Sequence, residues 1–425
     1  MFRMRAFVLL ALQCMLCSAY IVFPRTHSRY SRVTLAGQFD RPVVTSSPVS
    51  PEEGLDLAVS VEAQGFLKNI EQYGNNRMAR RAVGILQKMP AYKVIPSEVH
   101  YTACIKACEN SDQYKLAMSV YQEMLSKGIQ LTAVSYEALI SVAEKTGHFD
   151  QAVDLFQEML SKGFEGTTAT YNFCMMAVEK SGRFQLAMGM LADMKVKGIG
   201  RDMTTYTACT RACENAGAAG EALELLATMR ADGIEATAAP YNGALWACVK
   251  GGAPERALRL FDEMKDLHVV PDQSSYNAAI WAAEQIGDAS KAVLHLRYMK
   301  LDGWERQTMS FDGAISALAG VDRWEDVVDV LQWMNLDQVD KSPYTYKLAI
   351  GALDDHNQTA LAGEIYLEAL RDGYYSPWVP KSRLMDLRGF SLPLAKVALK
   401  TVLLSMIDGK QPVFMLKMVV GSVVG

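Results

Sequence analysis

The segments SYEALISVAEKTGHFDQAVDLFQEMLSKGF (residues 135–164) and TYNFCMMAVEKSGRFQLAMGMLADMKVKGI (residues 170–199) repeat one pattern at a spacing of 35 residues. Self-similarity at a fixed period is the signature of a stacked-repeat architecture. The aromatic residue that opens the pattern recurs every 35 residues at Phe66, Tyr101, Tyr136, Tyr171, Tyr206, Tyr241, Tyr276, Phe311 and Tyr346. A methionine series from Met89 to Met334 and an alanine series from Ala82 to Ala292 keep the same step. The period therefore decides the fold.

Each repeat contains the helical period twice. In residues 98–132, Tyr101, Ile105 and Cys108 form one apolar stripe at i, i+4 and i+7, and residues 117–124 carry a second. Glycines lie between the two stripes and again near the end of most repeats, where Gly can end a helix in the left-handed conformation. Neither helix can bury its stripe alone, so adjacent hairpins must stack. The sequence predicts an all-α fold, a right-handed α-solenoid of about nine hairpins over residues 63–377, with a concave face lined by the first helices.

The first 50 residues differ from the rest in charge and composition. They hold six arginines and one acidic residue, a net charge of +5. Since the whole chain has a net charge of −4, residues 51–425 carry a net charge of −9. Two arginines precede the apolar run AFVLLALQCMLCSAYIVF (residues 6–23), and an Arg-, Ser- and Thr-rich stretch follows it. A signal-like run followed by a transit-like segment resembles the bipartite plastid presequence of algae. We expect a targeting presequence over residues 1–50, a linker over 51–62 and no stable membrane insertion after presequence removal. Mitochondrial import and a signal-anchored membrane protein are the alternatives.

The cysteines do not indicate a metal site. Two of the eight lie in the apolar run, and the other six fall at the seventh or eleventh position of a repeat: Cys104, Cys108, Cys174, Cys209, Cys213 and Cys248. These positions are four residues apart on one helix, so each thiol is expected to point into the packed interior. No matching His or second Cys pair lies beside them, the six histidines are scattered, and there is no glycine-rich phosphate loop. We expect no metal, no cofactor and no enzymatic activity.

The period and the residues around it discriminate among helical-repeat families. Tetratricopeptide arrays run at 34 residues and HEAT or armadillo arrays at about 40 or more. The stretch YNGALWACVKGGAPERALRLFDEMKDLHVVPD (residues 241–272) has Tyr-Asn at its start, Gly at mid-repeat, Ala opening the second helix and Glu-Met near its end. This closely resembles the pentatricopeptide repeat family of the P class. The resemblance implies single-stranded RNA binding, mostly in plastids and mitochondria.

In that family one repeat reads about one base, mainly through its fifth and last residues. Repeats are taken to begin three residues before the aromatic residue. The implied base-reading pairs are Thr102 with Thr132, Asn172 with Asp202, Thr207 with Thr237, Asn242 with Asp272, and Asn277 with Gln307. The two Asn/Asp pairs match the combination that prefers uracil, the Thr pairs resemble purine-leaning combinations loosely, and Asn277 with Gln307 suggests a pyrimidine. Glu137, Asp312 and Lys347 depart from the usual types at the fifth position.

A second interpretation of these positions needs no RNA, because Asn, Thr and Asp also suit helix starts. Phosphate contacts are expected from Lys145, Lys180 and Lys250, which share the thirteenth position, although they could equally be solvated lysines at helix ends. The family's base-sandwiching second position holds residues of mixed polarity: Val99, Val134, Thr204 and Ser274. The acidic body predicts modest nonspecific affinity for RNA.

The 35-residue pattern stops after Pro377. We expect residues 378–425 to form a strand, a helix from about Leu392 to Ile407 with Ser391 as its N-cap, and a second strand. This tail resembles the first half of a small MutS-related (Smr) domain, whose Leu-Asp-Leu-His-Gly motif appears here as MDLRG, with Arg388 in place of the His. Loss of that His and of half the domain argues against nuclease activity, and a cap on the last repeat is the preferred interpretation.

The sequence therefore favours a sequence-selective single-stranded RNA-binding protein of an organelle. It would support transcript processing, stability or translation, with protein partners in an RNA-processing complex as a further expectation. The alternative is a protein-binding helical-repeat scaffold without RNA affinity.

Overall fold

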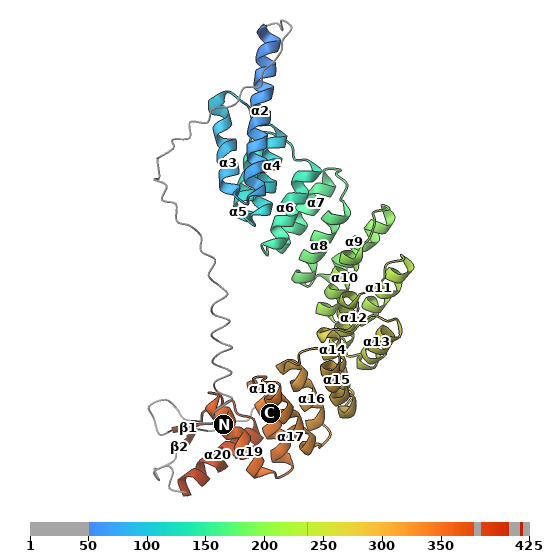
Figure 1. Cartoon of the computed structure of the whole chain (residues 1–425), viewed down its shortest axis with the longest axis vertical. Helices are drawn as coiled ribbons and strands as arrows, with labels where there is room; N and C mark the ends of the chain where they lie inside the picture. The colour runs from blue at the N-terminus through green and yellow to red at the C-terminus, as the bar shows by residue number, and fades with distance from the viewer. Residues whose placement is uncertain (1–50, 236, 378–383, 408–416, 420–425) are drawn as a thin grey trace, which may run out of the picture. The chain divides into compact units, whose positions relative to one another are not determined.

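The computed structural model describes residues 51–235, 237–377, 384–407 and 417–419. Within these ranges the chain folds as nine helical hairpins followed by a short strand, helix and strand (Figure 1). The first helices of the hairpins are α2 (Pro51–Asn75), α4 (Glu98–Asn110), α6 (Ala133–Lys145), α8 (Thr168–Ser181), α10 (Met203–Ala216), α12 (Ala238–Lys250), α14 (Gln273–Gln285), α16 (Thr308–Ala319) and α18 (Pro343–Asp355). The second helices are α3 (Ala79–Lys88), α5 (Tyr114–Ser126), α7 (Phe149–Ser161), α9 (Phe184–Val196), α11 (Ala219–Ala231), α13 (Pro254–Asp266), α15 (Ala289–Leu301), α17 (Trp324–Leu336) and α19 (Thr359–Arg371). A 3₁₀ turn over Met89–Tyr92 follows α3. The predicted α-solenoid is confirmed.

Helix ends follow from local chemistry. The last residue of a repeat is the N-cap of the next first helix, and Thr132, Asp202 and Asp272 each accept a hydrogen bond from the backbone N–H three residues on. At the turn within the hairpin, Gly147 and its equivalents have positive φ, which an L-residue adopts only with strain. The predicted left-handed glycine turns are confirmed.

The two helices of a hairpin belong to different layers. First helices of consecutive hairpins pack directly against one another from α4 to α18, whereas second helices pack mainly against first helices. The methionine and alanine series, and the aromatic series from Tyr101 onward, are buried in the interior that the layers share, and Tyr101, Ala117 and Met124 are each 0% exposed. Phe66, the first aromatic residue, is partly buried. The six repeat cysteines are also buried and unbridged, as predicted. The first helices therefore form a continuous inner layer, which leaves one stripe of each free for other contacts.

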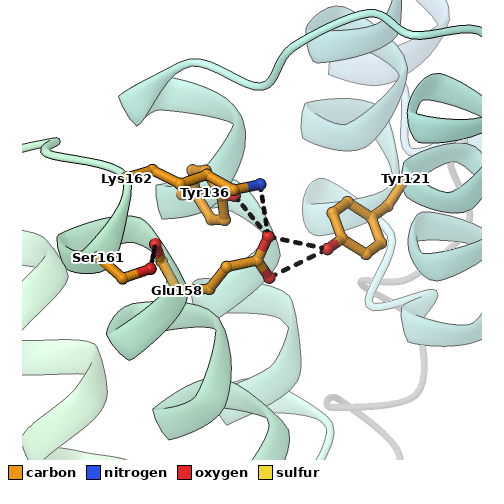
Figure 2. A network of polar contacts seen from close by, with 5 residues as sticks. All are labelled: Tyr121, Tyr136, Glu158, Ser161 and Lys162. Atoms are coloured by element: carbon orange, nitrogen blue, oxygen red, sulfur yellow. Dashed lines mark hydrogen bonds and ion pairs between the residues drawn. The ribbon is translucent and has the colours of Figure 1, made fainter.

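A polar network tightens the junction between hairpins at the buried tyrosine. The carboxylate of Glu158 in α7 accepts hydrogen bonds from Tyr136 (2.8 Å), from Tyr121 of the preceding hairpin (3.0 Å) and from Lys162 (2.7 Å) (Figure 2). Burial alone would raise the pKa of Glu158, but the hydrogen bonds from Lys162, Tyr136 and Tyr121 outweigh it and lower the pKa below 4.5. Burial and the same carboxylate raise the pKa of Tyr121 to about 12. The ionised carboxylate thus joins two consecutive hairpins.

The tail forms the predicted strand, helix and strand. Strands β1 (Leu384–Asp386) and β2 (Lys417–Val419) are parallel, with Met385 opposite Met418, and α20 (Leu392–Ile407) connects them. Leu394, Val397 and Ala398 of α20 are buried in a cluster with residues of α18 and α19. The tail therefore covers the apolar side of the last hairpin, which an open solenoid end would expose.

Two expectations on domain boundaries have different outcomes. Residues 51–62, expected to be a linker, form the first part of helix α2. The proposed presequence at residues 1–50 lies outside the described residues. No helix among the described residues has the length and apolar character needed to cross a bilayer.

Candidate nucleic-acid interface

The fifth residue of each repeat lies in the second turn of a first helix, next to the cap of the following first helix. This arrangement brings together the predicted pairs Asn172 with Asp202 and Asn242 with Asp272. The Asn172 Nδ2 lies 3.0 and 3.1 Å from the two carboxylate oxygens of Asp202, and the corresponding distances from Asn242 to Asp272 are 3.0 and 2.9 Å. Each pair therefore joins two hairpins.

A hydroxyl at the third helical position fixes the orientation of each amide. Thr205 Oγ1 donates to Asn172 Oδ1 at 2.7 Å, and Ser275 Oγ donates to Asn242 Oδ1 at 2.6 Å. The nitrogen must therefore face the carboxylate. The two oxygens of one carboxylate subtend a much smaller angle at Nδ2 than the two N–H bonds do, so a single N–H accounts for both contacts. The second N–H of each amide remains available as a donor.

The two Asn/Asp pairs differ in accessibility. Asn172 is 7% exposed, whereas Asn242 is more exposed and only partly buried. Asp202 is exposed and Asp272 partly buried. A ligand would reach the amide of Asn242 more easily than that of Asn172.

Thr102 and Thr132 are also brought together, but through a carboxylate. Both hydroxyls donate to Glu98 Oε1, at 3.0 and 3.1 Å, and both lie within hydrogen-bond distance of Ser135 Oγ. Thr102 is only 8% exposed. Glu98 therefore takes the hydroxyl hydrogens that a base would need, and the sequence analysis did not assign this residue a role.

The remaining two predicted pairs have no direct hydrogen bond within the described residues. Thr237 is exposed and its hydroxyl contacts Met203 Sδ at 3.6 Å rather than Thr207. Asn277 Oδ1 accepts from Ser310 Oγ at 2.7 Å, and Gln307 caps α16. In the eighth repeat, whose fifth residue departs from the usual types, Asp312 accepts from Thr345 (2.5 Å) as the Asn side chains accept from Thr205 and Ser275. Asp312 also accepts from Ser342 (3.2 Å), so the direction of this contact is opposite to that of the Asn/Asp pairs.

The three predicted phosphate-contacting lysines are exposed, and each already has an acidic partner. Lys145 Nζ lies 3.4 Å from Glu109, Lys180 lies 3.3 Å from Glu179 and Lys250 lies 2.8 Å from Glu214. These partners occupy the twelfth position of a repeat, where an acidic residue recurs at Glu109, Glu144, Glu179, Glu214 and Glu284. This edge of the inner layer therefore carries alternating charges rather than a cationic stripe. The recurrence of Glu at the twelfth position, next to the position of the three lysines, was the sequence signal for it.

The described residues contain no cluster of three His, Cys, Asp or Glu side chains that could hold a metal ion. In the tail, Arg388 makes a two-pronged contact with Asp386, at 2.9 Å from Nε and 2.6 Å from Nη2. These hydrogen bonds lower the pKa of Asp386 to about 2. Asp386 and Arg388, the two charged residues of the MDLRG stretch, are thereby bound to each other.

Comparisons with known proteins follow this geometry. A family model described as the pentacotripeptide-repeat region of PRORP matches residues 62–222 and 97–278, together about half of the chain. No curated protein matches the chain in sequence.

Several solved structures are similar in fold. PPR10 from maize is 19% identical with a TM-score of 0.44, over 85% of this chain and 57% of that one. PPR10 in complex with an 18-nucleotide psaJ RNA element is 16% identical with a TM-score of 0.43, over 76% and 57% of the two chains. The PPR domain of Arabidopsis thaliana protein-only RNase P 1, in complex with tRNA, is 18% identical with a TM-score of 0.39, over 45% and 94%. The chain thus spans 57% of the length of PPR10.

Proposed function

The chain belongs to the pentatricopeptide repeat family, and from that premise we propose that it binds single-stranded RNA selectively by sequence, without catalysing a reaction on it. The observation that carries this proposal is the pairing of Asn172 with Asp202 and of Asn242 with Asp272 on the inner layer. In both pairs the carboxylate orients the amide and leaves one N–H free. An N–H donor is complementary to a carbonyl oxygen on a base edge, and uracil presents two such oxygens. The two repeats lie two apart, so the target carries uracils separated by one nucleotide.

We place this activity in an organelle, with the plastid as the proposed compartment. The basic, Arg-rich composition of residues 1–50 and the apolar run within them support a targeting role for that segment. Binding at a defined RNA sequence would support the processing, stability or translation of a transcript.

The alternative function, a protein-binding scaffold, is supported by the acidic partners of Lys145 and Lys250. A phosphate must compete with Glu109 and Glu214 for these lysines, which lowers the gain from each phosphate contact. Base contacts must then supply most of the affinity, and a protein ligand would face no such competition.

Selection from a random RNA pool at near-physiological salt tests the proposal. The wild-type protein should enrich a motif with two uracils two positions apart. The double variant N172S and N242S should lose or shift the preference at those two positions. The matched control K347S changes an exposed fifth residue that is not expected to read a base, and should leave the motif unchanged.

Failure to enrich any RNA, with the protein shown to be helical by circular dichroism, would exclude the RNA-binding proposal in favour of the scaffold. Enrichment of a motif that the double variant retains would exclude base reading by these two amides.

A further inference from the structure

Two tryptophans occupy the same position in consecutive first helices. Trp246 in α12 follows Asn242 by four residues, and Trp281 in α14 follows Asn277 by four. A spacing of four residues places both side chains on the same helical face. Both tryptophans are partly buried, so each indole has one part packed in the layer and another part at its surface.

The polar edge of each indole faces the next hairpin. Trp246 Nε1 donates to Ser274 Oγ at 3.1 Å, and Ser274 lies in the first turn of α14. Trp281 Nε1 is buried without a hydrogen-bond partner among the described residues, and it lies 3.2 Å from the point where a Cβ on Gly313 would be. Because Nε1 is the only polar atom of the side chain, the exposed part of Trp281 is apolar. A side chain at position 313 would displace this indole.

The neighbours of the indoles on the same face are polar or cationic. Arg211 holds the equivalent position in α10, is exposed, and has no ion pair within the described part of the chain. By contrast, the equivalent Ser141 and Ser316 donate hydrogen bonds to Glu109 and Glu284. We call Arg211, Trp246 and Trp281 the aromatic row. It combines a cation with two flat carbon surfaces, each one helical turn after the fifth residue of its own repeat, which is Asn242 for Trp246.

We infer that Trp246 and Trp281 are stacking platforms for unpaired bases of the RNA, and that Arg211 contacts the same strand. This inference rests on the proposed function and names a binding mode within it. Stacking uses the face of a base, so it leaves the edge free for the Asn242 amide. It also needs no net positive charge, which this acidic array lacks. An apolar peptide would instead leave Arg211 and the Asn242–Asp272 pair unmatched.

The chain contains an internal comparison for this inference. The fourth and sixth repeats share the Asn/Asp pair and similar cap residues, Thr204-Thr205 and Ser274-Ser275, but the fourth has Met176 where the sixth has Trp246. Met176 is likewise partly buried against the core. Exchange of these two residues therefore tests stacking with side chains that the fold already accepts at that position.

The test measures the affinity of the full-length protein for a fluorescein-labelled 12-nucleotide oligouridine by anisotropy, beside a ribose-phosphate 12-mer of the same length without bases. The variants W246M and W281A should each weaken oligouridine binding at least about fivefold. M176W should strengthen it, and W246F should retain most of the wild-type affinity, because its ring still stacks. None of these changes should alter binding of the baseless oligomer. The control W333F alters a tryptophan of a second helix that packs against Arg297 and Arg306, and should have no effect on either ligand.

The outcomes separate this inference from the function on which it rests. If W246M and W281A bind oligouridine with the affinity of the wild type and have unchanged circular dichroism, stacking is overturned while RNA binding stands. The same result is expected if the aromatic row binds a peptide instead of RNA. Equal binding of oligouridine and the baseless oligomer by the wild type would overturn stacking and base reading together, and would leave only contacts to the ribose-phosphate backbone. A wild-type protein that binds neither would overturn both proposals.

Discussion

At the residue scale, the junctions between hairpins depend on ionised carboxylates that are only partly buried. Glu158 accepts three hydrogen bonds from two hairpins, and its pKa is lowered by them (Figure 2). Glu144, at the end of the neighbouring first helix, shows the opposite case, because burial raises its pKa more than Lys145 and Lys180 lower it. Similar carboxylates in one repeat therefore have opposite consequences for stability.

The variant E158Q should lower the free energy of unfolding by about 1 kcal/mol or more at pH 7. A carboxylate whose folded pKa is lowered stabilises the fold fully above its unfolded pKa of about 4.5 and loses that contribution as pH falls through the folded value. The difference between wild type and E158Q, measured by urea denaturation, should therefore shrink below pH 4.5.

The matched variant E144Q should leave stability at pH 7 unchanged or increased, because the ionised form of Glu144 is disfavoured in the fold. A loss of stability in E144Q equal to that in E158Q would show that the two pKa shifts do not govern these junctions.

Side-chain partners were the least predictable feature at this scale. Most of the buried repeat tyrosines bond an acidic residue, which lies 22 residues later for Tyr136 and 26 residues later for Tyr206 and Tyr276. In each of these three repeats only one of the two positions is acidic. Tyr241 has Glu263 at the first position but makes no hydrogen bond within the described residues, so the sequence does not predict whether the bond forms. Glu98 and the tryptophans of the aromatic row could not be assigned a role from the repeat pattern alone, although each tryptophan follows a fifth-position residue by four.

At the element scale, helix starts are set by cap residues that also contact the preceding hairpin. Asp272 accepts from the backbone of Ser275 at 3.0 Å while binding Asn242. The two interpretations of the last residue of a repeat, helix start and base-reading partner, are therefore compatible. The bounds of α20, from Leu392 to Ile407, could be predicted from the sequence. The start of α2 could not be predicted, since residues 51–62 were expected to be a linker. Contacts across the repeat boundary could not be, because they depend on how hairpins pack.

The variant D272A should destabilise α14 by about 1 kcal/mol or more, since it removes the N-cap and frees the Asn242 amide. Hydrogen exchange of the first-turn amides of α14 measures the loss. T237A is the matched control, because Thr237 occupies the same position before α12 and makes no side-chain cap hydrogen bond. Equal effects of the two substitutions would contradict the role given to the Asp272 cap.

At the scale of the whole molecule, stability is expected to be a sum over neighbouring hairpins, because each hairpin contacts mainly the next. The tail makes the last of these contacts between neighbours. It covers α18 and α19 through buried residues of α20, among them Val397, which is 3% exposed. The 35-residue period was enough to predict the stacked hairpins, and the end of that period predicted the cap.

The variant V397D should remove hydrogen-exchange protection from α18 and α19 while leaving α4 to α7 protected. The charge cannot remain buried in the apolar cluster, so the cap must detach or the last hairpin must open. L403D alters a residue of the same helix that is 45% exposed, and should leave protection unchanged. Loss of protection along the entire array in V397D would instead indicate that the hairpins unfold as one cooperative unit.

The bond between Asn172 and Asp202 has a consequence for how such a chain can grow. Asn172 and Asp202, like Asn242 and Asp272, lie 30 residues apart and on opposite sides of a repeat boundary. A tandem duplication of 35 residues recreates this relation at both junctions, wherever the breakpoints fall. A duplication whose length is not a multiple of 35 breaks this relation at the junction. Breakpoints are therefore unconstrained while length is fixed, and such an array can gain or lose recognition sites only in whole steps.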